Sequence, residues 1–247
     1  MKIIFKPILK YYLKLIAKLV LALHHPKIIV VAGSANKTFV RDEIKRILEK
    51  SGKTVRANPR NFNTEIGLPL AILNISSGYN SYREWWPVIG DAFWAIFQKN
   101  FPEYLVLELG ISQTGDMRYL LSIIQPEISV VTDITQRYLE SFSRMDKLVD
   151  EYAYLSEKTK KTGTLILNAD NLRIKELAKK SNAPVRYFGE SCEHEKDYQI
   201  VKITKAEAGQ KVEIRHEEKT EEFFIPRFGR HHAYALAAGL AVEEIVL

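Results

Sequence analysis

Residues 27–38 read KIIVVAGSANKT, an apolar run rich in β-branched residues that passes directly into Gly-x-x-x-Lys-Thr. The run predicts a buried strand over residues 28–32, and a helical pattern follows the motif as far as about Lys50. A strand, a glycine-led turn and a helix are typical of phosphate binding, because backbone N–H groups at the helix N-terminus face the anion. In this arrangement Lys37 contacts the outer phosphates and Thr38 binds Mg²⁺.

The loop departs from the usual motif at one position, because Asn36 stands where a glycine normally precedes the lysine. Asparagine tolerates a left-handed backbone better than any residue except glycine, so the loop can form at a cost of about 1 kcal/mol. Its side chain is still expected to crowd a bound phosphate. We predict that Gly33, Ser34, Asn36, Lys37 and Thr38 bind the phosphates of a nucleotide. An ordinary strand–turn–helix connection is the alternative.

A carboxylate, Glu108, ends a second apolar run at Leu105-Val106-Leu107. The carboxyl ends of parallel strands meet at one edge of the sheet, and such folds bind their ligands there. Glu108 is therefore expected beside the loop, where it would hold Mg²⁺ together with Thr38. The alternative is a carboxylate that merely caps the end of a strand.

Strands alternate with helices along the rest of the chain, which predicts an α/β fold with a mostly parallel, Rossmann-like sheet covered by helices on both faces. Further strands are expected at 54–57, 104–109, 128–132, 164–167 and 185–188, and a small antiparallel meander at 198–204, 211–216 and 221–225. Helices are expected at 82–100, 118–124, 139–161, 171–181 and 231–246, and residues 58–70 are predicted to be a loop. Trp85, Trp86 and Trp94 fall in one of these helices and are interpreted as core or lid packing.

The composition is that of an ordinary globular chain, with 247 residues, 46% apolar and 27% charged. This excludes wholesale disorder and a polytopic membrane protein. The single cysteine, Cys192, excludes a disulfide framework and a cysteine-based zinc site. The net charge of +6 resides in the six lysines of residues 1–27, and the other 220 residues carry 30 basic and 30 acidic side chains. A nucleic-acid-binding surface spread over the fold is therefore not expected.

Residues 1–26 are predicted to form a basic amphipathic helix that precedes one domain over residues 27–247. A lysine recurs at every fourth residue from Lys6 to Lys18, with large apolar side chains between. The apolar runs fall short of the roughly 20 residues that a membrane-spanning helix needs. One interpretation is a helix that lies on an anionic membrane surface through residues 1–25. The others are a helix packed on its own domain and a helix bound in the groove of a partner.

Five further segments follow the phosphate loop in chain order: NFNTEIGLP at 61–69, LELG at 107–110, the strand region at 126–134, LNAD at 167–170 and GRH at 229–231. With the loop, they resemble the central ATP-binding domain of the Mur ligases, most nearly the branch that adds D-alanyl-D-alanine to a UDP-MurNAc tripeptide. The resemblance covers residues 27–247. It implies that Asn168 and Asp170 lie near the adenine, that His231 contacts the nucleotide, and that ATP and Mg²⁺ are the cofactors.

The resemblance also implies a reaction, in which ATP phosphorylates a carboxylate and an amine then attacks the acyl phosphate to form an amide. In the family one Mg²⁺ lies near the loop threonine and the glutamate, and a histidine and a carbamylated lysine hold a second. Tyr138 and Tyr152 stand at those last two positions. A phenol cannot form the carbamate, and a neutral tyrosine is a poor ligand for Mg²⁺. The sequence therefore predicts that the second metal site is lost.

The family's uridine-nucleotide domain and C-terminal domain are expected to be missing, so a UDP-MurNAc peptide would be bound through missing or partner domains. Whether the chain is a fragment or a natural stand-alone domain stays open. The first hypothesis is a cytoplasmic ATP-binding domain of an amide-forming ligase that is not competent alone. The second is a catalytically degenerate nucleotide-binding or scaffold module, peripheral on the inner face of the membrane. A P-loop protein that only hydrolyses nucleotides is the least favoured.

Overall fold

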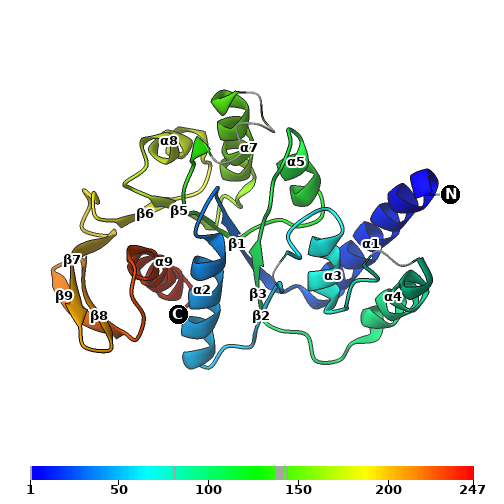
Figure 1. Cartoon of the computed structure of the whole chain (residues 1–247), viewed down its shortest axis with the longest axis horizontal. Coiled ribbons are helices and arrows are strands. Elements are labelled where there is room, and N and C mark those ends of the chain that lie inside the picture. The colour runs from blue at the N-terminus through cyan, green and yellow to red at the C-terminus, as the bar shows by residue number, and fades with distance from the viewer. Residues whose placement is uncertain (1, 60, 80–81, 137–141, 143) are drawn as a thin grey trace.

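The computed structural model describes residues 2–59, 61–79, 82–136, 142 and 144–247, and these residues form one nine-stranded sheet (Figure 1). Its order is β2-β3-β1-β4-β5-β6-β7-β8-β9. The strands are β1 (Lys27–Ala32), β2 (Val55–Ala57), β3 (Tyr104–Glu108), β4 (Ile128–Val131), β5 (Thr164–Asn168), β6 (Val185–Gly189), β7 (Tyr198–Ala206), β8 (Gly209–His216) and β9 (Lys219–Ile225).

The pairing of the strands confirms the predicted fold class. From β2 to β7 every pair is parallel, and β7–β8 and β8–β9 are antiparallel, as expected for the meander. The central strand β1 pairs with β3 and β4, in a register that sets Val31 beside Glu108 and Ala32 beside Val131. The carboxyl ends of these three strands therefore meet at one edge of the sheet.

Helices cover both faces of the sheet, and alternate residues of β1 point to opposite faces. Ile29 and Val31 join one apolar core with α2 and α9, whereas Ile28 and Val30 join the other core with the remaining large helices. The helices are α1 (Lys2–His24), α2 (Lys37–Lys50), α3 (Gly67–Leu73), α4 (Tyr82–Trp94) with the 3₁₀ turn η1 (Ala95–Phe97), α5 (Asp116–Leu121), α7 (Met145–Lys158), α8 (Leu172–Lys175) with η3 (Glu176–Lys180), and α9 (Arg230–Val246).

One face of α1 packs on its own domain. Leu13, Ala17 and Val20 are fully buried in the core that also contains α3 and α4. The Tyr12 hydroxyl donates a hydrogen bond of 2.8 Å to the carbonyl oxygen of Ile89 in α4. Among the described residues, no helix combines the length and the apolar character needed to cross a membrane.

The elements differ from the sequence prediction in a few places. Residues 58–70 were expected to be a loop, yet α3 begins at Gly67. Glycine and proline favour loops, but Pro69 fits the first turn of a helix, where its missing N–H has no partner to lose. Every residue of α3 is buried, so packing stabilises this short helix. The helix expected at 139–161 is described from Met145 to Lys158, and residues 137–141 and 143 lie outside the described chain.

The tryptophans were interpreted as core or lid packing, and core packing is wrong for two of them. Trp85 is buried, but Trp86 and Trp94 are 71% and 68% exposed. Successive helical residues are about 100° apart around the axis, so Trp86 points away from the direction in which Trp85 is buried.

Candidate nucleotide-binding site

The loop between β1 and α2 has the backbone that its sequence predicts. Asn36 takes the left-handed conformation, with φ 63°. Gly33 has φ 142°, and a Cβ atom at this position would lie 2.2 Å from Thr132 Oγ1. A side chain at position 33 is therefore excluded, because that distance is far shorter than a van der Waals contact.

The end of β4 holds the loop in place. The Ser34 N–H donates to the Asp133 carbonyl oxygen at 2.6 Å, and the Thr132 hydroxyl donates to the Ala35 carbonyl oxygen at 2.6 Å. The Ser34 hydroxyl is buried and has no hydrogen-bond partner within the described residues. A buried hydroxyl without a partner is costly, so this group fits a site that receives an acceptor such as a phosphate oxygen.

Lys37 folds back over the loop. Its ammonium group donates to the Gly33 carbonyl oxygen at 2.8 Å, and the residue is 9% exposed. The positive charge therefore lies at the N-terminus of α2, where the helix dipole already favours an anion. The structure thus brings the Lys37 ammonium group to the loop and the start of α2, the arrangement that the predicted phosphate site requires.

Glu108 lies beside the loop, as the sequence predicted, and three donors surround its carboxylate. Thr38 Oγ1 donates to Oε2 at 2.9 Å, and Asn63 Nδ2 donates to Oε1 at 2.9 Å. The Arg41 guanidinium Nη1 lies 3.3 Å from Oε2. Glu108 and Arg41 are 6% and 4% exposed, so this is a buried ion pair.

Asn58 fixes the end of β3 and was missed in the sequence. Its side-chain amide donates to the Glu108 carbonyl oxygen at 2.9 Å and accepts from the Glu108 N–H at 2.8 Å. Arg41 was also missed, although its position four residues after Lys37 places it on the same face of α2. Nothing local in the sequence marks Asn58, because its partner is 50 residues away.

The ion pair predicts a loss of stability for Glu108→Gln. The substitution keeps a hydrogen-bonding side chain but leaves the buried Arg41 without its carboxylate, and breaking a buried pair costs about 3–5 kcal/mol. Asp42 still contacts Arg41 at 2.5 Å, so we expect the lower end of that range. Urea denaturation measures the free energy of unfolding.

Lys211→Gln is the control, because it breaks the ion pair of Lys211 with Glu222, which spans 2.7 Å on the exposed surface. We expect a change within about 0.5 kcal/mol for it. A Glu108→Gln variant as stable as this control would show that the buried pair is dispensable.

The phosphate loop, the asparagine-rich segment at residues 61–64 and the end of β3 enclose an open cleft of about 500 Å³. Gly110 donates its N–H to the Asn63 carbonyl oxygen at 2.8 Å, which closes the segment over β3. The predicted residues that line this cleft are Ser34, Asn36, Lys37, Thr38 and Glu108, and the segment adds Asn61, Asn63 and Thr64.

The residues predicted near the adenine lie at the carboxyl end of β5, where Asn168 is the last residue and Asp170 follows two residues later. Asn168 Nδ2 donates to the Thr132 carbonyl oxygen at 2.8 Å, so Thr132 joins this segment to the phosphate loop. The Asp170 carboxylate accepts from the Tyr234 hydroxyl at 2.6 Å and from the N–H groups of Glu190 and Ser191 at 2.8 and 2.7 Å. Burial alone would raise the pKa of Asp170, but these hydrogen bonds hold it below its ordinary value. Asp170 thus ties α9 to the β6–β7 loop.

His231 lies at the start of α9 against the phosphate-loop helix. Its ring is 4.2 Å from that of Phe39, which directly follows Thr38, and 4.2 Å from that of His232. Burial and the neighbouring His231 lower the pKa of His232. The predicted contact residue therefore lies beside the cleft, in a cluster of three rings.

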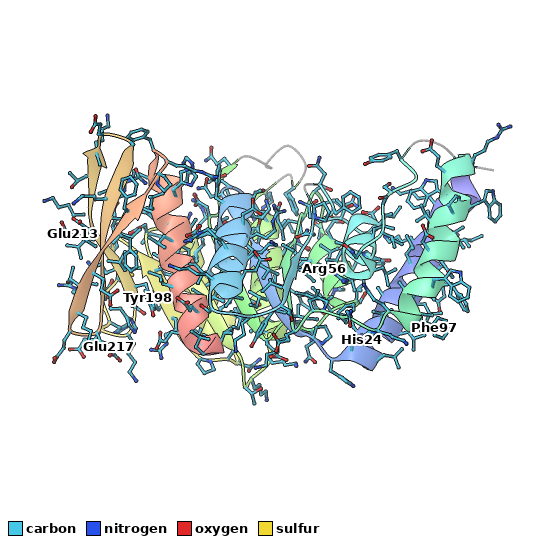
Figure 2. The ribbon with its side chains drawn as sticks, turned by 90° about the horizontal axis from the view of Figure 1, so that it is seen from below. His24, Arg56, Phe97, Tyr198, Glu213 and Glu217 are labelled. Carbon is cyan, nitrogen blue, oxygen red and sulfur yellow. The ribbon has the colours of Figure 1, made fainter. Side chains whose placement is uncertain are left out.

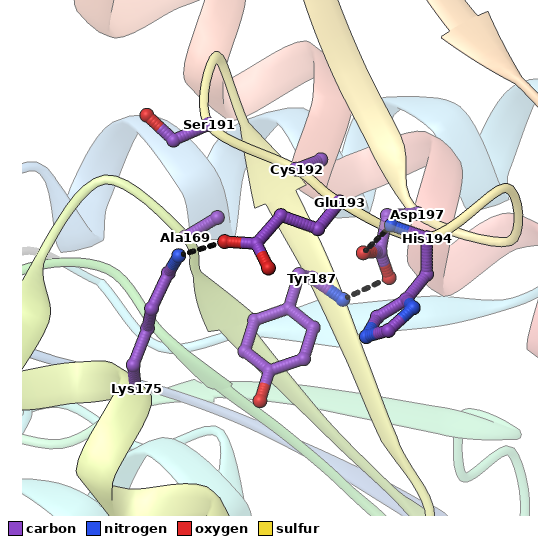
Figure 3. Close-up of a pocket in the computed structure, with 8 residues that line it drawn as sticks. All are labelled: Ala169, Lys175, Tyr187, Ser191, Cys192, Glu193, His194 and Asp197. Atoms are coloured by element: carbon purple, nitrogen blue, oxygen red, sulfur yellow. Dashed lines mark hydrogen bonds and ion pairs between the residues drawn. The ribbon is translucent and has the colours of Figure 1, made fainter.

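A smaller cavity of about 120 Å³ lies beside Ala169, between Asn168 and Asp170 in the sequence (Figure 3). Its polar groups bind one another: the Lys175 ammonium lies 2.9 Å from the Glu193 carboxylate, and the Tyr187 N–H donates to Asp197 at 2.9 Å. Burial raises the pKa of the Cys192 thiol to about 12, so it is not a nucleophile near neutral pH.

Of the two positions of the predicted lost second metal site, the structure describes only Tyr152. Tyr138 lies outside the described residues. Tyr152 lies on the buried face of α7, where it is 1% exposed in the core. The neighbouring Glu151 carboxylate accepts hydrogen bonds from the N–H groups of Gly115 and Met117 at 2.7 and 2.8 Å, so it caps the N-terminus of α5. Within the described chain, no three His, Cys, Asp or Glu residues are grouped to hold a metal ion.

Residues 90–242, more than half of the chain, match the Mur ligase middle domain. The chain therefore belongs to the Mur ligase family, which confirms the resemblance seen in the sequence.

Individual relatives agree with this assignment. The UDP-N-acetylmuramoyl-tripeptide–D-alanyl-D-alanine ligase of Haemophilus influenzae is 24% identical over 219 residues, which are 87% of this chain and 42% of that protein. The fold matches MurF ligase from Thermotoga maritima in complex with ADP, with a TM-score of 0.79 and 20% identity over 96% of this chain and 49% of that one. MurF from Acinetobacter baumannii gives 0.78 and 17%, over 96% and 47%. The chain thus spans less than half the length of these relatives.

Proposed function

We propose that this chain is the ATP-binding domain of an ATP-dependent ligase that joins a carboxylate to an amine in peptidoglycan-precursor synthesis. The observation that carries the proposal is the contact between Thr38 and Glu108 at the edge of a loop that ends in Lys37. The names of the relatives support the substrate class, a UDP-N-acetylmuramoyl peptide. That substrate would be bound through domains or partners other than this one.

The residues of the cleft fit a nucleotide phosphate and one Mg²⁺. Gly33 lets the loop lie close against Thr132, and the Ser34 hydroxyl offers a buried donor. Thr38 and Glu108 supply the hydroxyl and carboxylate oxygens that Mg²⁺ prefers, and this ion commonly takes few protein ligands and completes its shell with water and phosphate. Bound Mg²⁺ would offset the negative charge of the phosphates. Asn168, Asp170 and His231 are proposed to contact the remainder of the nucleotide.

The binding prediction is tested by calorimetric titration with ATP, with and without Mg²⁺. We expect weak, Mg²⁺-dependent binding. Lys37 and Thr38 supply the expected phosphate and Mg²⁺ contacts, whereas the Asn36 side chain leaves less room for the phosphates. Lys37→Ala should reduce affinity more than about tenfold, since a charge-assisted hydrogen bond to phosphate is worth about 1.5–3 kcal/mol.

Lys45→Ala is the matched control, because Lys45 lies on the same helix and pairs with Glu49 on its exposed face. Affinity should be unchanged in this variant. If Lys37→Ala also bound ATP as the unaltered protein does, the loop would not be the nucleotide site.

A second candidate is a catalytically degenerate nucleotide-binding or scaffold module without ligase chemistry. The observation that supports it is the burial of the Tyr152 phenol, at the position that the sequence resemblance assigns to the carbamylated lysine. In this proposal, as in the first, the protein is cytoplasmic. The basic residues 1–25 would place it on the anionic inner face of the membrane.

A further inference from the structure

Four aromatic side chains are exposed on α4 and η1, at the end of the molecule opposite β7–β9 (Figure 2). Trp86, Phe93, Trp94 and Phe97 are 71%, 48%, 68% and 62% exposed. The last three rings form a cluster, with centroids 5.8–5.9 Å apart. Trp86, Phe93 and Phe97 are spaced by seven and four residues, so they form one row along the helix. Exposed apolar groups gathered in this way mark an interaction surface.

The outer face of α1 continues this surface. Ile8, Leu15 and Leu19 are 63%, 55% and 43% exposed. Each lies within about 60° of Tyr12 around the helix axis. Tyr12 is the residue whose hydroxyl bonds to α4, so the exposed apolar row lies on the side of α1 that faces α4.

Lysines of α1 border the exposed row of Ile8, Leu15 and Leu19 on the side away from α4. Lys10 and Lys14 place their ammonium groups 3.8 and 4.9 Å from the ring of Tyr119 in α5. Burial, together with the positive charges of Lys18 and Lys10, lowers the pKa of Lys14. Among the described residues, Lys6 is the only one of the lysines at positions 6, 10, 14 and 18 that forms an ion pair. Its partner is Glu65, at 3.3 Å. The surface formed by α4 and α1 is therefore apolar in the middle and positively charged along the edge that the lysines form.

We propose that α1 and α4 together form one binding surface for an anionic phospholipid bilayer, with the aromatic row of α4 entering the headgroup region and the lysines of α1 contacting lipid phosphates. This inference rests on the proposed membrane association of residues 1–25 and adds α4 to it. Charge complementarity favours a bilayer, because α1 contains lysines and no acidic residue. Tryptophan favours the membrane–water interface, where its ring is apolar and its N–H stays hydrated.

Vesicle titrations test the surface with the full-length chain, because α1 supplies core residues and cannot be removed cleanly. The probe is a phosphatidylcholine vesicle with or without phosphatidylglycerol, and co-sedimentation gives the partition coefficient. We expect binding that requires phosphatidylglycerol and weakens as salt rises. Tryptophan emission should shift to the blue, because Trp86 and Trp94 are exposed in the free protein.

The key variant is Trp86→Ala/Trp94→Ala/Phe97→Ala, which should lose about tenfold or more in partition coefficient. Its control is Phe224→Ala/Phe228→Ala, which removes two aromatic rings that are 56% and 55% exposed and lie away from α1 and α4. This variant should leave the partition coefficient unchanged. Lys14→Gln/Lys18→Gln should lose about fivefold per lysine, in contrast to the exposed pair Lys205→Gln/Lys219→Gln.

Three results would overturn the inference, and they can be told apart. Aromatic variants that bind as well as the unaltered chain, with binding lost in the lysine variant, would leave the association through residues 1–25 standing without α4. Absence of vesicle binding by the unaltered chain would overturn both. Self-association that the aromatic variant abolishes, without vesicle binding, would assign the surface to a second copy. ATP titration reports separately on the nucleotide site.

Discussion

The chain alone is expected to release no ADP in response to UDP-MurNAc peptides and amines, and to form neither acyl phosphate nor amide. Tyr152 is buried in the core. The resemblance places it at the position of the family's carbamylated lysine, so we expect that the second Mg²⁺, one of two that would stabilise phosphoryl transfer, lacks a ligand. Loss of a single preorganised electrostatic contact costs about 10²–10³ in rate, and loss of a metal should cost at least as much. A coupled ADP-release assay with a panel of carboxylates and amines measures this.

Two variants calibrate that assay. Lys37→Ala sets the background, because it removes the proposed phosphate contact. Tyr138→His/Tyr152→Lys restores the family's residue types, but it places an ammonium group where the structure holds a buried phenol, so circular dichroism must first show that the variant folds. Robust turnover by the unaltered chain that requires both substrates and disappears in Lys37→Ala would refute the loss of the second metal site.

Removal of residues 1–25 is expected to abolish the folded state. This segment contributes Leu9, Leu13, Ile16, Ala17 and Val20 to the core shared with α3 and α4. Deleting one large buried aliphatic side chain costs about 2–5 kcal/mol, so the loss of several exceeds the 5–15 kcal/mol by which a typical domain is stable. The truncated chain should be insoluble, or should lack a cooperative transition on heating.

A matched pair on the same helix isolates the effect of burial. Leu13→Ala should reduce the free energy of unfolding by about 2–5 kcal/mol, because Leu13 is fully buried. Leu15→Ala, two residues further on and 55% exposed, should change it by less than about 0.5 kcal/mol. Equal losses, or a 26–247 chain that unfolds cooperatively, would show that α1 is an appendage.

The phosphate loop could be predicted from the sequence because its signal is local: a buried strand, a glycine that needs positive φ and a helix start lie within twelve residues. Glu108 could be placed beside it because parallel strands carry their carboxyl ends to one edge. Asn58 and Arg41 could not be assigned, since each gains its role from a partner about 50 residues or more away.

The role of α1 could not be settled from the sequence for a different reason. Its apolar residues extend more than halfway around the helix, so the pattern alone does not separate a face that packs on the domain from a face that meets another surface. The structure shows that both exist, since Leu13 is buried and Leu15 is exposed. The same limit misled the interpretation of Trp86 and Trp94, which adjoin buried neighbours.

The position of α1 ahead of its packing partners bears on how the protein is made. The helix ends at His24, whereas the elements that bury its inner face run from Gly67, at the start of α3, to Phe97, at the end of η1. A ribosome adds about 5–20 residues per second, so the last of these partners follows α1 by roughly 4–15 s. Through that interval the nascent helix has both apolar faces open. Synthesis is therefore the stage at which α1 most needs a chaperone or a surface to cover it.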